Sequence, residues 1–208
     1  MAAIIFDFDG TIADSFDYVA GFLAGEAGVG TLSEDQKQEM RGLSMAAMAR
    51  HLGCSWWRLP FLLIKGRRRM GEAIKQLQPF DGMSDVIEKL HAEGHELFVV
   101  SSNSVRNIRA FLHHQDLHQH FLEIYGGIGL FGKAPALRKL LRDQHLKAKN
   151  AVYIGDELRD VQAAQSIKLP VVAVTWGFAR PADLADLKPT ALADTPEELI
   201  EVLGDVYS

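Results

Sequence analysis

Asp7 and Asp9 stand at the end of an apolar run near the start of the chain, in the stretch IIFDFDGTIADS (residues 4–15). Residues two apart in an extended strand point the same way, so both carboxylates are expected on one side of the strand. Gly10 follows directly and gives the backbone the freedom to turn. Thr11 offers a hydroxyl that can hydrogen-bond a neighbouring carboxylate or the backbone. Two acids placed in this way are candidates for a nucleophile and a general acid and base.

Further polar side chains follow three later apolar runs, at the points where strands are expected to end. They are Ser101, Ser102 and Asn103 after the second run, Lys133 in the loop after the third, and Asp156 and Asp160 after the fourth. In an open parallel sheet, ligands bind beyond the carboxyl ends of the strands, so these groups are expected to meet at one edge. Clustered carboxylates are costly unless a cation neutralises them. Oxygen ligands such as Asp7 and Asp156 suit Mg²⁺.

The chemistry that these groups suit is phosphoryl transfer. With a metal ion bound, Asp7 can approach a phosphate group and form an aspartyl-phosphate. Asp9 can protonate the leaving oxygen and later deprotonate a water molecule. Ser101 and the following backbone N–H, that of Ser102, can hold the phosphoryl oxygens, whose charge Lys133 neutralises.

The elements that must position these groups alternate between strands and helices. Apolar runs predict strands buried on both faces at residues 2–8, 96–102, 122–127, 151–156 and 170–176. Helical patterns lie between them, at residues 84–94, 104–114, 135–144 and 160–168. This alternation predicts an α/β fold, with a parallel sheet that is covered on both faces and joined by right-handed crossovers.

The region from about residue 15 to residue 79 departs from this alternation, because it shows helical patterns and no buried-strand run. The first strand is thereby separated from the rest of the sheet by an all-helical insertion. We therefore predict a core domain of residues 1–14 and 80–208 and a helical cap of residues 15–79.

Composition and charge limit the class of protein. The chain has 208 residues, of which 48% are hydrophobic and 24% charged, as in ordinary soluble globular proteins. The net charge of −5 argues against a general nucleic-acid binder. One cysteine, Cys54, allows no internal disulfide and fits a reducing compartment. With no signal peptide evident and no run long enough to span a membrane, we expect a cytoplasmic protein.

Four short stretches in order resemble the motifs of the haloacid dehalogenase-like superfamily: DFDGT (7–11), Ser101 after an apolar strand, Lys133 before a helix, and IGDELRD (154–160). The insertion directly after DFDGTIADS resembles the helical (C1-type) cap of the phosphoglycolate phosphatase-like branch. The resemblance implies a Rossmann-like core and a Mg²⁺-dependent phosphatase that acts on a small, soluble, phosphoglycolate-like phosphate monoester through an aspartyl-phosphate.

The resemblance also implies a role for each matching residue. Asp7 is then the nucleophile, Asp9 the acid and base as well as a metal ligand through its carbonyl oxygen, Ser101 and Lys133 are phosphate contacts, Asp156 is a metal ligand, and Asp160 supports the site. Gly10, Thr11 and Asn103 are expected to support it as well, and Ser102 to contribute its backbone N–H.

Three other functions remain open at this point. A phosphomutase would keep the phosphoryl group and return it to a second hydroxyl. A catalytically silent protein would use the same fold only to bind. A P-loop nucleotide-binding protein is the third, because GIGLFGKA (127–134) matches G-x-x-x-x-G-K. However, Ala134 stands where that loop needs Ser or Thr, and Pro135 follows where its helix would begin.

The stretch SWWRLPFLLIKGRRRM (55–70) has several interpretations. Its aromatic residues could pack the interior of the cap while the arginines remain solvated. Alternatively, the cations could form a rim that attracts anionic substrates. The whole stretch could instead dock on a membrane surface or pair two caps in a dimer. The sequence leaves the oligomeric state and the substrate's identity open.

Overall fold

The computed structural model of the protein describes residues 2–129 and 132–207. Within this range, the chain forms a six-stranded sheet in the order β3-β2-β1-β4-β5-β6. All neighbouring strands are parallel, which confirms the predicted α/β fold. The strands are β1 (Ala3–Phe6), β2 (Glu96–Val100), β3 (Phe121–Tyr125), β4 (Ala151–Gly155), β5 (Val171–Val174) and β6 (Ala191–Ala193).

Strand β1 lies in the middle of the sheet and is buried on both faces. Ile4 and Phe6 pack into the apolar cluster on one face, and Ala3 and Ile5 pack into the cluster on the other. All four side chains are almost fully excluded from solvent. A strand covered on both faces gains from apolar side chains at every position, which explains the unbroken run that predicted it.

Helices cover both faces of the sheet. The first cluster takes side chains from α5 (Met83–Ala92), α6 (Val105–His114) and α10 (Pro196–Val206), and the second takes them from α7 (Lys133–Asp143), α8 (Leu158–Gln165) and α9 (Pro181–Asp186). Short 3₁₀ turns, His118–His120 and Ala148–Asn150, precede β3 and β4. The expected helix at 135–144 begins two residues earlier, so that Lys133 is its first residue.

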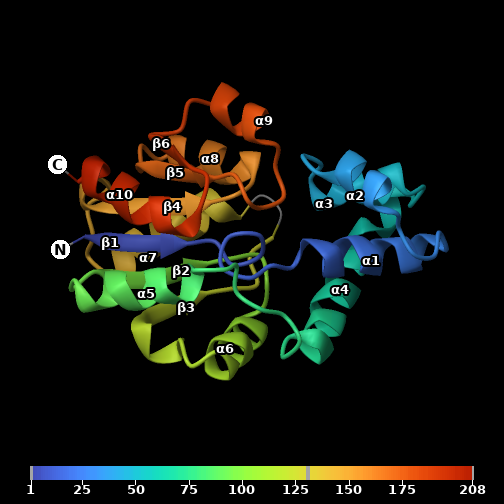
Figure 1. The fold of residues 1–208 in the computed structure, drawn as a ribbon, viewed down its shortest axis with the longest axis horizontal. Helices are drawn as coiled ribbons and strands as arrows, with labels where there is room; N and C mark the ends of the chain where they lie inside the picture. The colour runs from blue at the N-terminus through green and yellow to red at the C-terminus, as the bar shows by residue number, and fades with distance from the viewer. Residues whose placement is uncertain (1, 130–131, 208) are drawn as a thin grey trace.

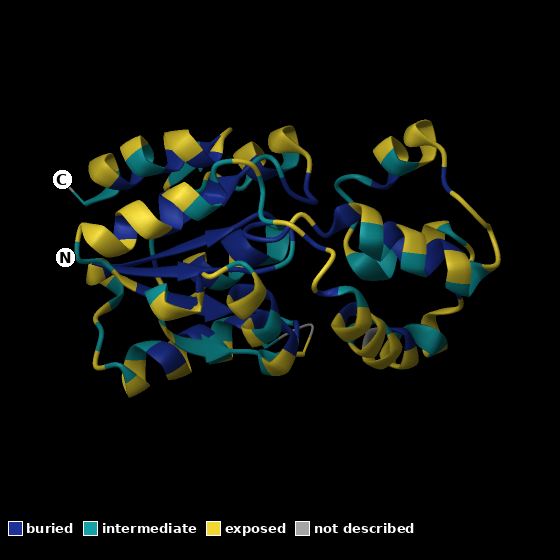
Figure 2. Cartoon of the chain, turned by 60° about the horizontal axis from the view of Figure 1, so that its bottom comes forward, coloured by how far each residue is buried: buried dark blue, intermediate teal, exposed yellow. Residues whose placement is uncertain are grey.

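Four further helices lie together at one end of the molecule, away from both chain termini (Figure 1). They are α1 (Phe16–Ala27), α2 (Glu34–Met40), α3 (Met45–His51) and α4 (Leu59–Ala73), with a 3₁₀ turn at Trp56–Arg58 before α4. We call residues 15–79 the helical segment. It contains most of an apolar cluster that includes Leu23, Met40, Met48 and Leu62, together with Phe178 from outside the segment. Figure 2 shows that these helices bury part of their surface. The division into a core and a cap domain at these bounds stays a prediction.

The chain leaves the sheet and returns to it at one point. The Asp14 N–H donates to the Gln78 carbonyl at 3.0 Å, and the Phe80 N–H donates to the Ile12 carbonyl at 3.1 Å. Ala13 forms an antiparallel bridge with Pro79 between these two bonds. The two segments that connect the helical segment to the sheet are therefore hydrogen-bonded to each other, and such a pair of connections can act as a hinge.

Large apolar residues of the 3₁₀ turn Trp56–Arg58 and of the start of α4 face solvent. Trp56 is 76% exposed and Trp57 60%, and Phe61 and Ile64 are exposed as well. The interpretation that these aromatic residues pack the interior of the cap is therefore wrong. Contact with a membrane or with a second copy stays a prediction. In the part of the chain that is described, no helix combines the length and apolarity needed to cross a bilayer.

Candidate active site

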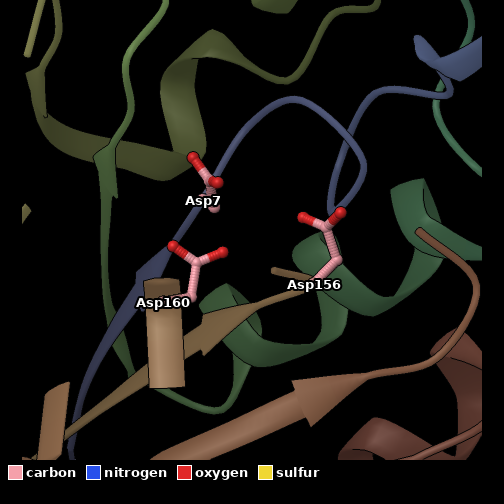
Figure 3. Close-up of side chains that lie close together, drawn as sticks. All are labelled: Asp7, Asp156 and Asp160. Atoms are coloured by element: carbon pink, nitrogen blue, oxygen red, sulfur yellow. The ribbon is translucent and has the colours of Figure 1, made fainter. Parts of the chain in front are cut away.

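The acids predicted at two strand ends meet at the carboxyl edge of the sheet (Figure 3). Asp7 follows β1, and its N–H extends the pairing with β4 by donating to the Ile154 carbonyl at 2.8 Å. Asp156 follows β4, and Asp160 lies in the first turn of α8. One carboxylate oxygen from each of the three acids lies within 4.8 Å of the others, and all three residues are buried.

Lys133 is buried among these acids. Its Nζ contacts Asp7 Oδ2 at 2.5 Å and also donates to Asp160 Oδ1. Asp160 is fixed in turn by the Tyr153 hydroxyl and by the Glu157 N–H. Burial lowers the pKa of Lys133, but the charges of Asp160 and Asp7 outweigh it and leave the pKa above its usual value. The lysine is thus a fixed positive charge, held in place by Asp160.

The second oxygen of Asp7, Oδ1, is buried and has no hydrogen-bond partner among the described residues. Burial raises the pKa of Asp7 to about 7, although the charge of Lys133 opposes the rise. A buried carboxylate oxygen without a partner is costly unless a further group binds there. Oδ1 is therefore the atom that is available to a cation or to an incoming phosphorus.

Asp156 is held tightly by the turn after β1 and by a loop of the core. The Thr11 hydroxyl donates to Asp156 Oδ1 and the Phe178 N–H to Oδ2, both at 2.8 Å. Gly10 has φ +80°, and a Cβ there would lie 2.2 Å from Asp156 Oδ2, so both backbone and space require glycine. Burial, together with the charges of nearby acids, raises the pKa of Asp156 well above its ordinary value.

The three buried carboxylates fit a divalent cation. They supply hard oxygen atoms that are close enough together to bind one cation. The single positive charge of Lys133 does not balance three carboxylates. Asp7 Oδ1 has no hydrogen-bond partner among the described residues. Among the same residues, the oxygens of Asp156 accept only from neutral donors, the Thr11 hydroxyl and the Phe178 N–H, whereas Asp160 is already paired with the charge of Lys133. Asp7 and Asp156 therefore keep the most negative charge for a cation. The predicted ligand set, which includes the carbonyl of Asp9, stays a prediction.

Asp9 lies beside the cluster and contacts Asn103. The Asn103 Nδ2 donates to both Asp9 oxygens, at 3.1 and 3.3 Å. Burial raises the pKa of Asp9 to about 6, and the hydrogen bond from Asn103 limits the rise. Ser101 is fully buried, and its Oγ accepts the Asn103 N–H at 3.1 Å, whereas Ser102 lines the adjoining cavity. Which of the two serines contacts phosphate stays a prediction.

A cavity of ≈ 110 Å³ lies between this edge of the sheet and the helical segment. The core lines it with Asp9, Ser102, Asn103 and Arg159, and the helical segment with Tyr18, Phe22, Ser44, Met45, Arg67 and Met70. Sequence reasoning included Arg67 among the cations of residues 55–70 that could attract anionic substrates, but it did not identify Arg159. Arg159 lies inside the recognised IGDELRD stretch, which could have singled it out. Arg67 is one of three consecutive arginines, and nothing in the sequence distinguishes it from Arg68 or Arg69.

The two arginines are held in different ways. The Arg159 Nη2 donates to Glu157 Oε1 at 2.7 Å, and its Nε lies 2.5 Å from Glu157 Oε2. The Arg67 Nη2 reaches from α4 to the Ile128 carbonyl of the core at 2.9 Å. The cavity wall therefore carries two guanidinium groups, one of them partly balanced by Glu157.

Comparison with known proteins gives concordant results. A family model described as haloacid dehalogenase-like hydrolase matches residues 4–174. A phosphoglycolate phosphatase from Synechococcus elongatus is 35% identical over 206 residues, covering 98% of this chain and 97% of that protein. A phosphoglycolate phosphatase from Vibrio parahaemolyticus is 26% identical over 219 residues, covering 97% and 95%.

The fold has a similar match among solved structures. A haloacid dehalogenase-like family hydrolase from Streptococcus pneumoniae superposes with a TM-score of 0.81 at 24% identity, covering 98% of each chain. That likeness supports the arrangement of sheet and helices. The chain therefore belongs to the haloacid dehalogenase-like hydrolase family.

Proposed function

We propose that the protein hydrolyses a small phosphate monoester, with Asp7 as the nucleophile. The observation that carries the proposal is the buried, unpartnered Oδ1 of Asp7, whose other oxygen is held by Lys133. In the first step Oδ1 forms a bond to phosphorus while the bond from phosphorus to the ester oxygen breaks. Asp9 donates a proton to the departing oxygen. Lys133 balances the charge on the phosphoryl oxygens, and the backbone N–H of Ser102 donates a hydrogen bond to one of them.

The second step regenerates Asp7. Asp9, now ionised, removes a proton from a water molecule, which attacks the phosphorus of the aspartyl-phosphate and releases inorganic phosphate. A pKa raised to about 6 suits an acid that must both give and take a proton near neutral pH. We assign Mg²⁺ to the carboxylate cluster, where it would be held by Asp7 and Asp156 and would lower the charge repulsion between Asp7 and the phosphate.

The helical segment is proposed to act as a cap that excludes water and selects the substrate. The cavity of ≈ 110 Å³ is small beside the roughly 300–1,000 Å³ of sites for drug-sized ligands. Arg67 and Arg159 favour a substrate with an anionic group besides its phosphate. Phosphoglycolate, the substrate in the names of two relatives, has this size and charge. We further propose a cytoplasmic location and no nucleic-acid partner.

The test is phosphate release from a panel of phosphate esters and one phosphate anhydride in the presence of Mg²⁺. The panel contains phosphoglycolate, ethyl phosphate, a sugar phosphate, a nucleoside monophosphate and pyrophosphate. We expect the highest kcat/KM for phosphoglycolate, because ethyl phosphate lacks the carboxylate and the sugar phosphate and the nucleotide exceed the cavity. Pyrophosphate is of similar size but presents a tetrahedral phosphate in place of the planar carboxylate. A preference for the nucleotide or the sugar would contradict the substrate assignment. No release from any member would contradict the phosphatase itself and favour a mutase or a binding protein.

Metal binding is expected to strengthen as the pH rises to about 7. Folding raises the pKa of Asp7, so the protonated side chain stabilises the metal-free protein. This contribution to stability is full below the ordinary pKa of an aspartate and is lost as the pH rises from there to about 7. Magnesium binds the ionised form, so it competes with protons and restores that stability. The measurement is the rise in Tm caused by MgCl₂, which should be larger at about pH 8 than at about pH 5.5. An equal rise at both pH values would show that Asp7 is not a ligand.

A further inference from the structure

A continuous row of hydrogen bonds runs from helix α4 through two buried asparagines to Asp9. The Asn107 Nδ2 donates to the backbone carbonyl of Arg67 at 2.8 Å and to Asn103 Oδ1 at 2.9 Å. The Asn103 Nδ2 donates in turn to the Asp9 carboxylate. We infer that Asn107 is a positioning residue, which places Asp9 for proton transfer when α4 is docked on the core. The inference rests on the proposed function.

The orientation of both amides follows from their neighbours. The Ser104 N–H can only donate, and it lies 2.8 Å from the Asn103 side-chain oxygen. The Nδ2 of Asn103 must therefore face Asp9. The Arg67 carbonyl can only accept, so the Nδ2 of Asn107 must face α4. Each amide has one arrangement that satisfies all of its partners, and the row has a defined direction from α4 to the carboxylate.

Helix α4 is shaped to make this contact. Asn103 is 4% exposed and Asn107 5%, so the protein supplies most of the partners of both amides. Gly71 lies one helical turn after Arg67, and a Cβ at Gly71 would be 2.8 Å from Asn107 Oδ1. The approach of α4 to the amide thus depends on glycine at that position. Without α4, Asn107 would lose the Arg67 carbonyl, the acceptor that fixes the rotation of its amide. Asn107 would then no longer be held in place to donate to Asn103 Oδ1.

The contact uses the backbone of α4 and not a side chain that touches substrate. Asn107 does not line the cavity of ≈ 110 Å³, whereas Asn103 and Asp9 do. Its effect on the reaction can pass through Asn103 to Asp9 or through the Arg67 carbonyl to the position of the Arg67 side chain, and the choice of substrates separates the two. By the first route, docking of the helical segment would be coupled to the proton transfer that a poor leaving group requires.

The experiment compares two small substrates that differ in their need for an acid. The alkoxide leaving from ethyl phosphate must be protonated, whereas the acetate leaving from acetyl phosphate needs no proton. Neither substrate carries the second anionic group that Arg67 is proposed to bind, so a displaced Arg67 would affect both equally. The variants are Asn107→Leu, which keeps the volume and removes the donors, and Gly71→Ala, which presses on the amide from α4. Gly25→Ala in α1 is the control, because a Cβ there meets nothing within 4 Å. The readout is kcat/KM, which covers the steps up to leaving-group departure.

We expect both variants to lose about 10- to 100-fold in kcat/KM on ethyl phosphate and less than about threefold on acetyl phosphate. The control should match the wild type on both substrates. Equal losses on the two substrates would overturn the inference and leave Asn107 a structural residue, while the proposed function would stand. A wild type that releases phosphate from no ester would overturn the proposed function and this inference together. Agreement between the two variants guards against a folding defect in either one.

Discussion

Replacing Asp7 with asparagine is expected to abolish phosphate release while leaving the protein folded. The amide keeps the size of the side chain but cannot attack phosphorus, so the rate should fall by a factor of about 10⁴ or more. Lys133 keeps its contact with Asp160, and a buried carboxyl whose pKa is raised is replaced by a neutral group. The free energy of unfolding should therefore change by no more than about 1–2 kcal/mol. Phosphate release and denaturant unfolding measure the two quantities.

The nucleophile can also be identified directly. A rapidly quenched reaction with ³²P-labelled ester should leave label on the wild-type protein and none on the Asp7→Asn variant. Asp17→Asn is the matched control, since Asp17 is an exposed acid that pairs with Lys37 on the helical segment. This control should retain full activity. Label on another residue, or a variant with a tenth of the wild-type rate, would show that Asp7 is not the nucleophile.

Replacing Lys133 with methionine is expected to affect stability as well as activity. The substitution leaves Asp7 and Asp160 buried without their shared cation, and removal of one partner from a buried ion pair costs about 3–5 kcal/mol. Loss of the charge that faces the phosphoryl group should also lower kcat by about 10²- to 10³-fold. Denaturant unfolding gives the first quantity, and steady-state kinetics at saturating Mg²⁺ give the second.

The matched control for Lys133→Met is Lys139→Met on the same helix. Lys139 is an exposed lysine that pairs with Asp143 at the surface, so its loss should cost less than about 0.5 kcal/mol. The penalty at Lys133 should also depend on pH. Lys133 lowers the pKa of Asp7, so its removal raises that pKa further, and the loss of stability should be larger at about pH 8 than at about pH 5.5. A loss that does not change with pH would contradict the buried ion pair.

The sequence predicted the parallel sheet well because the central strands are buried on both faces. A strand such as β4, with all five residues buried, leaves an apolar run that few other structures produce. Strand β6 was missed because it has only three residues, Ala191–Ala193, two of them partly exposed. Helices α9 and α10 were missed as well, although a proline stands at the first position of each.

The residues of the site were predicted better than their contacts. Strand ends placed Asp7, Lys133 and Asp156 at one edge, because the topology of a parallel sheet decides that position. The choice of Asp160 as the partner of Lys133 depends on the first turn of α8, which sequence spacing does not resolve. The contribution of Asn107 depends on how α4 docks on α6, and no local pattern encodes that packing. Contacts across the helical segment were therefore the part that required a structure.

The place of β1 in the sheet has a consequence for how the protein folds. Strand β1, which Asp7 follows, is synthesised before the other strands of the sheet, yet its residue Ile5 pairs with Phe98 on one side and with Tyr153 on the other. Sheets built from such distant pairings fold slowly, because loop closure must precede the contacts that stabilise it. During synthesis, the apolar strand β1 stays uncovered until its neighbours β2 and β4 have been made, and until then it can aggregate. Fragments that end before β4 should not bind the metal, because two of the three acids of the cluster, Asp156 and Asp160, are still missing.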